Sequence, residues 1–337
     1  MRFCKKCLLP ETYPKIVLDE DGVCNVCHQY EQKWKDFDAA KSEKKFAKIV
    51  KDAERRYGKV VVTVSGGLDS SYAILLMRKK FGVEVVGANF DHGFVSDVAK
   101  QNLERIKRIL GVDIVTIKPD FNILYSLYKD FLLATGDFCT PCCQGVVRSG
   151  FLVARMHRTK TIVHGGVSGS KVEFNVLGML KHHYERFMKY AGKNYPSEKL
   201  ENIVTRPEEA KEFEVVSMPQ YVRWNEFEIV NTLKREFGWQ SRPNGRTRHV
   251  DCLVADASDF LLQRKFGFSR RWMIISANIR AGFINVEEGR DMIKREEEKL
   301  LTEPVESISL LLEKLHLRRS NVYSLPHYVA EPAVKHL

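Results

Sequence analysis

Short apolar runs and amphipathic segments alternate along the first half of the chain. Four runs rich in Val and Ile have the length and composition of buried strands, and they cover residues 59–64, 84–90, 112–117 and 161–164. Segments with helical spacing of apolar residues lie between or beside them, at 71–81, 96–110, 122–134 and 145–157. Strands separated by helices pair in parallel through right-handed crossovers, so the pattern predicts an open, doubly wound α/β sheet.

The flanking segments extend this pattern. Apolar residues at helical spacing within residues 31–59 predict an amphipathic helix before the first strand. Residues 214–218 predict one more strand, and residues 224–237 predict a helix. Residues 168–215 show no clear period, and we interpret them as a loop-rich segment that faces the substrate. The remainder, residues 242–337, is expected to be mainly helical.

Two cysteine pairs stand close to the start of the chain. Cys4 and Cys7 form the first pair and Cys24 and Cys27 the second, each with two intervening residues. This spacing is typical of a zinc ribbon, in which four thiolates surround one Zn²⁺ and leave no position open for a substrate. We therefore expect a structural zinc module over residues 1–35, an α/β domain over 36–240, and a helical region over 241–337 that helps to close the substrate site.

The composition limits which binding partners and which cellular compartment we expect for the protein. The 337 residues carry 54 Lys and Arg against 43 Asp and Glu, a net charge of +11, with an ordinary 44% of hydrophobic residues. No apolar run approaches the roughly 18 residues of a membrane span, and we expect a cytoplasmic protein whose cysteines are thiols. The positive charge indicates an anionic partner, either nucleic acid or a phosphorylated small molecule.

A glycine-containing turn follows the first predicted strand directly. Its sequence is Ser65-Gly66-Gly67-Leu68-Asp69-Ser70, and a helix begins at once. Glycines let the backbone approach an anion, and the amide groups at the start of the helix point toward it, so the turn predicts a phosphate site. The loop lacks the Lys of a Walker motif, whereas Asp69 could hold Mg²⁺ against phosphate oxygens.

This turn resembles the SGGxDS signature of the PP-loop ATP pyrophosphatases, which share the adenine nucleotide alpha hydrolase-like fold. The resemblance implies that ATP binds with its β- and γ-phosphates in the loop and that an acceptor oxygen attacks the α-phosphorus. It assigns pyrophosphate binding and catalysis to the loop and Mg²⁺ to Asp69, with adenine and ribose near the end of the second strand. The residues concerned are Ser65, Gly66, Gly67, Asp69, Ser70, Asn89, Phe90, Asp91 and, as another wall of the site, Gly165.

Further segments are similar to the N-acetyl sugar amidotransferase family. They are the cysteine pairs with Leu8-Leu9-Pro10-Glu11-Thr12, the SGG loop, Asp137-Phe138-Cys139-Thr140-Pro141-Cys142, Lys265-Phe266-Gly267-Phe268 and Ile279-Arg280-Ala281-Gly282. That family converts the acetamido group of a sugar, usually a nucleotide sugar, into an acetamidino group during assembly of lipopolysaccharide O-antigen or of pseudaminic and legionaminic acids. The resemblance therefore implies ATP, Mg²⁺, Zn²⁺ and an acetamido nucleotide sugar.

The ammonia for such a reaction needs a source. A glutaminase with an N-terminal nucleophile requires Cys after the initiator Met, but position 2 is Arg, and the chain lacks the Gly-x-Cys-x-Gly elbow of the other common type. A separate glutaminase subunit is therefore expected. The family resemblance suggests one like the histidine-biosynthesis glutaminase, delivered with a cyclase-like barrel protein.

A second group of cysteines leaves two interpretations open. Cys139, Cys142 and the distant Cys252 resemble the ligands of an iron–sulfur cluster in PP-loop tRNA thiolases, and three thiolates with one open position would also suit zinc. Under this alternative the basic surface would bind RNA. The simpler interpretation is that these thiols pack beside the site without metal. A third hypothesis makes the chain a docking protein with a degenerate nucleotide fold, against which the intact Ser65 and Asp69 argue.

Candidate substrate contacts lie in two basic clusters. Residues 242–248 and 265–271 contain Arg246, Arg248, Arg270 and Arg271, whose guanidinium groups would suit a sugar diphosphate or a carboxylate. The alternative is that these arginines only solvate helix ends. Glu173, shortly after the fourth strand, is a candidate acid–base group.

Overall fold

Five short parallel strands form a single sheet in the order β3-β2-β1-β4-β5. The computed structural model describes residues 1–34, 37–166, 176–242, 248–328 and 331–337. The strands are β1 (Val60–Thr63), β2 (Val85–Phe90), β3 (Asp113–Ile117), β4 (Thr161–His164) and β5 (Glu214–Ser217). The expected α/β fold with a parallel sheet is therefore confirmed, including the strand at residues 214–218. The chain winds in opposite directions from β1, toward β2 on one side and toward β4 on the other, and such a switch leaves a crevice for ligands at the carboxyl ends of the strands.

One face of the sheet is covered by helices that precede or follow β1, β2 and β5. They are α2 (Ala39–Tyr57), α3 (Leu68–Leu75) with its π-helical continuation Leu76–Lys80, α4 (Asp97–Leu110) and α9 (Glu226–Phe237). Val60 and Val62 of β1 point to this side and pack with Phe46 of α2 and Ile106 of α4, whereas Val61 points to the other. This alternation is the period-two pattern of a strand buried on both faces.

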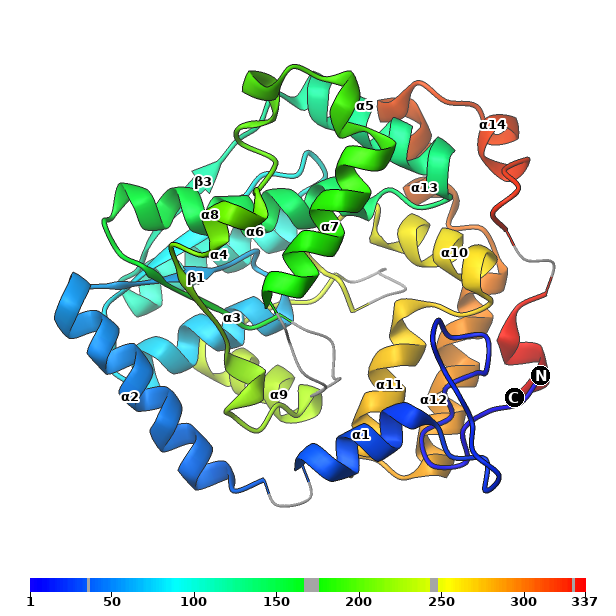
Figure 1. Ribbon diagram of the computed structural model, residues 1–337, viewed down its shortest axis with the longest axis horizontal. Coiled ribbons are helices and arrows are strands. Elements are labelled where there is room, and N and C mark those ends of the chain that lie inside the picture. Colours follow the sequence, from blue (N-terminus) through cyan, green and yellow to red (C-terminus); the bar gives the residue numbers. More distant parts are fainter. Residues whose placement is uncertain (35–36, 167–175, 243–247, 329–330) are drawn as a thin grey trace.

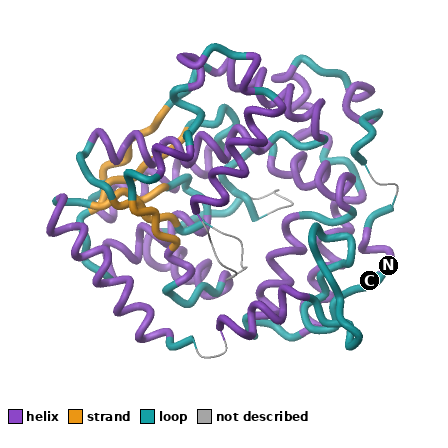
Figure 2. The backbone as a smooth tube through the Cα atoms, viewed as in Figure 1, coloured by secondary structure: helices purple, strands orange, loops and turns teal. Residues whose placement is uncertain are grey.

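The other face is covered by α5 (Phe121–Thr135) and α6 (Cys139–Met156), with α10 (Ala255–Phe266) and α13 (Val305–Leu315) behind them. Figures 1 and 2 show the strands gathered on one side of the molecule and surrounded by helices. Helix α6 begins six residues earlier than the sequence predicted. A Cβ on its Gly145 would lie 2.2 Å from the ring of Phe90, so the helix reaches the sheet only because this position has no side chain.

The sequence prediction for residues 168–215 was wrong in part. Residues 176–190 form a helix, α7 (Val176–Tyr190), and Phe187 on it is fully buried in the same core as α5 and α6. The chain then continues through short turns and α8 (Pro207–Ala210) into β5. After α9 it is mainly helical, as expected, with α11 (Arg270–Arg280), α12 (Val286–Glu298) and α14 (Arg319–Tyr323) completing the C-terminal region.

The cysteine-containing N-terminal segment packs against α11. Phe3 stacks on Trp272 with 5.8 Å between ring centroids, and the indole of Trp272 donates a hydrogen bond to the carbonyl of Leu8 at 2.9 Å. In Figure 1 this segment lies beside α11 and α12. The expected helix over residues 31–59 is instead two helices, α1 (Asn25–Trp34) and α2, of which the second is capped by Asp38. Within the described ranges, no helix combines the length and apolar character needed to cross a bilayer.

Candidate functional site

A cavity of about 440 Å³ opens at the carboxyl ends of the strands, beside the switch in strand order. Its walls include the turn after β1, Phe90 at the end of β2, His164 at the end of β4 and Val215 of β5. The segment between residues 248 and 255 closes it from the C-terminal half of the chain. A concave site at this edge is where an α/β sheet is expected to bind a ligand.

The turn after β1 is held in one conformation by its own hydroxyls. The Oγ of Ser70 accepts a hydrogen bond from the amide of Ser65 at 3.1 Å and lies 3.2 Å from the Oγ of Ser65. Gly67 occupies the N-cap position of α3, where, in this described part of the chain, no side chain caps the helix. The first amides of α3 are therefore available to an anion in the cavity.

Gly66 needs both its conformation and its lack of a side chain. Its φ is +78°, and a Cβ there would lie 2.4 Å from the carbonyl oxygen of Ala99. Its own carbonyl accepts hydrogen bonds from Asn102 and from the indole of Trp239, each at 3.1 Å. These contacts hold the turn close to the start of α4. Gly165 has a similar role on the other side, because a Cβ there would lie 2.4 Å from the carbonyl oxygen of Asp69.

Asp69, the expected Mg²⁺ ligand, lies within an ion-pair network. Both of its carboxylate oxygens accept from the guanidinium of Arg248, at 3.0 and 2.9 Å, and one also accepts from the indole of Trp224 at 2.9 Å. Arg248 lies 3.5 Å from Glu226, which in turn accepts from Arg271 at 2.8 Å. Burial acts to lower the pKa of Arg248, but Asp69 and Glu226 raise it above its usual value. The network keeps Arg248 charged at the cavity wall.

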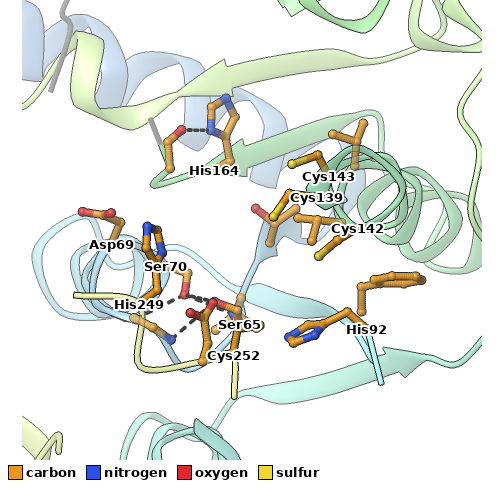
Figure 3. Close-up of a pocket in the computed structure, with 18 of the residues that line it drawn as sticks. Ser65, Asp69, Ser70, His92, Cys139, Cys142, Cys143, His164, His249 and Cys252 are labelled. Atoms are coloured by element: carbon orange, nitrogen blue, oxygen red, sulfur yellow. Dashed lines mark hydrogen bonds between the residues drawn. The ribbon is translucent and has the colours of Figure 1, made fainter. Parts of the chain in front are cut away.

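The cysteines of α6 lie across the cavity from Asp69. Cys139, Cys142 and Cys143 project from the first turns of α6, as Figure 3 shows, and Cys252 lines the cavity from the C-terminal half of the chain. The Sγ of Cys139 lies 3.0 Å from the Oγ of Ser258. Burial raises the pKa of Cys142 well above its usual value, which favours a protonated thiol. Within the described residues, these cysteines do not form a converging set of three or more metal ligands.

Three histidines also line the cavity: His164, at the end of the fourth strand in the segment that was expected to form a wall of the site, and His92 and His249, which the sequence analysis did not single out. Burial lowers the pKa of each, to about 4 for His164, whose Nδ1 lies 2.5 Å from the carbonyl of Gly166. For His249 the nearby arginines lower the pKa further, well below the usual value. The imidazoles are therefore neutral at pH 7 and add no positive charge to the cavity.

The remaining predicted residues divide into four groups. Phe90 and Arg270 line the cavity, and Arg270 donates to the buried Asp259 at 2.6 Å. The side chain of Asn89 instead donates to the carbonyl of Val64 at 2.8 Å, and Asp91 accepts from the amide of Gly93 at 3.1 Å. Arg271 pairs with Glu226 behind the cavity wall. Glu173 and Arg246 lie outside the described residues.

The four N-terminal cysteines converge as their spacing predicted. All four sulfurs lie within 4.8 Å of one another and are buried, with 3.7 Å between Cys4 and Cys27 and between Cys7 and Cys24. Four sulfurs at about 2.3 Å from a tetrahedral ion would be about 3.8 Å apart, whereas a disulfide requires about 2.05 Å. The amide of Cys24 also donates to the sulfur of Cys4 at 3.2 Å. The group is positioned to hold a metal ion such as zinc.

Two polar residues of the site gave no signal in the sequence. Asp251 lines the cavity beside the glycine turn, and Trp224, which packs against the core, also donates from its indole to Asp69. Neither belongs to a recognisable motif, and each lies more than 150 residues from the turn that it approaches. No protein-family model matches the chain.

Proposed function

We propose that the protein is an ATP-dependent N-acetyl sugar amidotransferase of the PP-loop type, which adenylates an acetamido group and replaces its oxygen with nitrogen. One observation carries the proposal: the Ser65–Ser70 turn, with the uncapped start of α3, forms a wall of a cavity at the carboxyl edge of a parallel sheet. An anion at a helix start in this position is favoured by the peptide dipoles and the free amides.

The chemistry explains the need for ATP. An amide oxygen is a poor leaving group, so nitrogen cannot replace it until the oxygen carries a phosphoryl group. The acetamido oxygen would attack the α-phosphorus of ATP and release pyrophosphate, giving an O-adenylyl imidate. Ammonia would then add to the imidate carbon, and AMP would leave with the original oxygen. The amides of the turn, Ser65 and Ser70 would hold pyrophosphate, while Arg248 and Arg270 would offset the negative charge of the reacting phosphates.

The proposal includes partners and a pathway. The acceptor would be an acetamido nucleotide sugar for lipopolysaccharide O-antigen or nonulosonic acids, processed in the cytoplasm. Ammonia would come from a separate glutaminase similar to that of histidine biosynthesis, with a cyclase-like barrel protein as a further partner. The four N-terminal cysteines would form a zinc ribbon with a structural role, because four sulfur ligands complete the coordination of Zn²⁺.

A direct assay tests this function. The purified protein is incubated with ATP, Mg²⁺, ammonium and candidate acetamido nucleotide sugars, and the products are analysed by mass spectrometry. We expect AMP, pyrophosphate and an amidine product that is about 1 Da lighter than the acceptor, since O is replaced by NH. Formation of ADP, or of no amidine with any acceptor, would refute the proposal.

A second candidate function is tRNA thiolation, and it is favoured by one observation. Four cysteines line the same cavity as the glycine turn. An iron–sulfur cluster on Cys139, Cys142 and Cys252 would require these side chains to move together, because their sulfurs do not form a converging ligand group in the described structure. Anaerobic purification distinguishes the two functions: iron, a brown chromophore and transfer of sulfur to tRNA would favour thiolation, whereas zinc alone would favour the amidotransferase.

A further inference from the structure

A second carboxylate lies against the glycine turn. The Oδ2 of Asp251 is 3.2 Å from the position that a Cβ on Gly67 would occupy, and Asp251 is one of the residues that line the cavity. Gly67 therefore leaves space between this carboxylate and the first amides of α3. A phosphate bound to those amides would lie close to an acidic group, and that arrangement is repulsive unless a cation lies between them.

Backbone hydrogen bonds fix the position of Asp251. The amide of Ser96 donates to the carbonyl of Asp251 at 3.2 Å, and the amide of Leu253 donates to the carbonyl of Phe94 at 2.8 Å. The hydroxyl of Ser96 also donates to the carbonyl of Val250 at 2.5 Å. The segment is thus paired with the connection between β2 and α4, and the carboxylate is held beside the turn by ordered backbone.

The two carboxylates near the turn differ in their partners. Asp69 uses both oxygens for Arg248 and one also for Trp224, so a cation that bound Asp69 would have to displace a buried guanidinium. For Asp251, by contrast, the described structure contains no ion pair. A hard cation such as Mg²⁺ prefers one or two carboxylates together with phosphate oxygens and water.

We propose that Asp251 binds the divalent cation that accompanies the polyphosphate at the Ser65–Ser70 turn, and that Asp69 is a positioning residue that holds Arg248 at the cavity wall. This inference rests on the proposed binding of ATP at the turn. Asp251 would supply one oxygen to the cation, and the phosphates and water would supply the others. Substitution of Asp251 should then change the dependence on the metal, whereas substitution of Asp69 should change the placement of the arginine.

The test measures binding of ATP by calorimetry at a series of Mg²⁺ concentrations and in EDTA. In the wild type, Mg²⁺ is expected to tighten ATP binding. In Asp251→Asn this tightening should fall by at least about tenfold, while binding in EDTA should be unchanged or tighter, because a repulsive charge has been removed. Asp97→Asn, at an exposed carboxylate near the start of α4, is the matched control and should behave as the wild type.

Each other outcome has a distinct meaning. If Asp251→Asn retains the full effect of Mg²⁺ and Asp69→Asn loses it, the assignment to Asp251 is overturned while the proposed function stands. If the wild type binds no ATP with or without Mg²⁺, both the assignment to Asp251 and the proposed function are wrong. Thermal melting checks that each variant is folded, and Asp251→Ser replaces Asp251→Asn if the latter does not fold.

Discussion

Arg280 donates a hydrogen bond to the sulfur of Cys7 at 3.1 Å and so joins the last turn of α11 to the four-cysteine group. The opposite end of the same helix reaches the cavity: Arg270 lines it, and Arg271 pairs with Glu226, the carboxylate that Arg248 also approaches. One helix of eleven residues therefore connects the N-terminal cysteine group with the charged wall of the candidate site.

Removal of metal should affect α11 as well as the N-terminal segment. With four thiols in place of a metal-bound group, the contacts of Leu8 and Phe3 with Trp272 would loosen, because the segment has few apolar residues of its own. We expect about one zinc per chain by elemental analysis, and a melting temperature that falls by about 5 °C or more after chelation or in Cys27→Ser. Cys143→Ser, an exposed thiol, is the control. An unchanged melting temperature after complete loss of zinc would contradict this prediction.

The close packing of the glycine turn can be tested by alanine substitution at two glycines that have the same φ, one in the turn and one outside it. Gly66 and Gly58 both have φ +78°, but a Cβ on Gly58 would meet nothing within 4 Å, whereas one on Gly66 would lie 2.4 Å from a carbonyl oxygen. Gly58→Ala should cost about 1 kcal/mol in the free energy of unfolding, from the left-handed conformation alone. Gly66→Ala should cost at least about 2 kcal/mol more, since backbone must move. Urea denaturation measures both, and equal losses would argue against the close packing at Gly66.

The pair of Asp69 and Arg248 should couple strongly. The side chains of Asp69 and Arg248 are 23% and 15% exposed, and a carboxylate oxygen lies 2.9 Å from a guanidinium nitrogen. Asp97 and Lys100 form an ion pair with the same distance between carboxylate oxygen and ammonium nitrogen, but their side chains are 87% and 62% exposed. In a double-mutant cycle with Asp69→Asn and Arg248→Met, we expect a coupling of about 1–3 kcal/mol in unfolding free energy. The exposed pair should give less than about 0.5 kcal/mol. Similar values for the two pairs would show that the buried one has no special role in stability.

Glu297 should give the protein a distinctive dependence on pH. Burial raises the pKa of this carboxyl to about 7, despite hydrogen bonds from Ser269 and Gln263 that act in the opposite direction. Between the unfolded value of about 4.3 and 7, the native state retains a proton that the unfolded state has lost. Stability should therefore decrease as pH rises through this window, by about 1.4 kcal/mol for each tenfold difference in proton affinity.

The comparison uses Glu297→Gln, which cannot ionise. Subtracting its unfolding free energy from that of the wild type should give a curve that falls between pH 4.3 and 7 and is flat above it. Glu287→Gln, at an exposed position on the same helix, should leave the curve of the wild type unchanged. A flat difference for Glu297→Gln would mean that this carboxyl titrates normally.

The features that the sequence predicted well are those with local causes. The Val-rich run after residue 59 forms a central strand because β-branched apolar residues suit a sheet buried on both faces, and the spacing of the N-terminal cysteines suffices to bring four sulfurs together. Likewise the turn at Ser65 lies where a phosphate loop was expected, at the edge of the sheet.

The features that the sequence did not predict depend on partners that are far apart in the sequence. Asp251 and Trp224 reach the turn through packing of the C-terminal half, so no neighbouring residue reveals their position. The pairing of Asp69 with Arg248 joins residues 179 positions apart and changes the role expected for the carboxylate. Helix α7 was overlooked because two histidines, one glycine and several charged residues interrupt its apolar spacing, although tertiary contacts bury Phe187 completely.

Two glycines of α6 lie against the sheet at close range. A Cβ on Gly145 would overlap the ring of Phe90, and one on Gly150 would lie 3.2 Å from the Cγ2 of Thr63. Any larger residue at position 145 would lift the helix and carry Cys139 and Cys142 away from the strands. The width of the binding space therefore depends on the side of α6 that faces the sheet, and a single methyl group at position 145 would change which molecule is admitted without altering the phosphate turn.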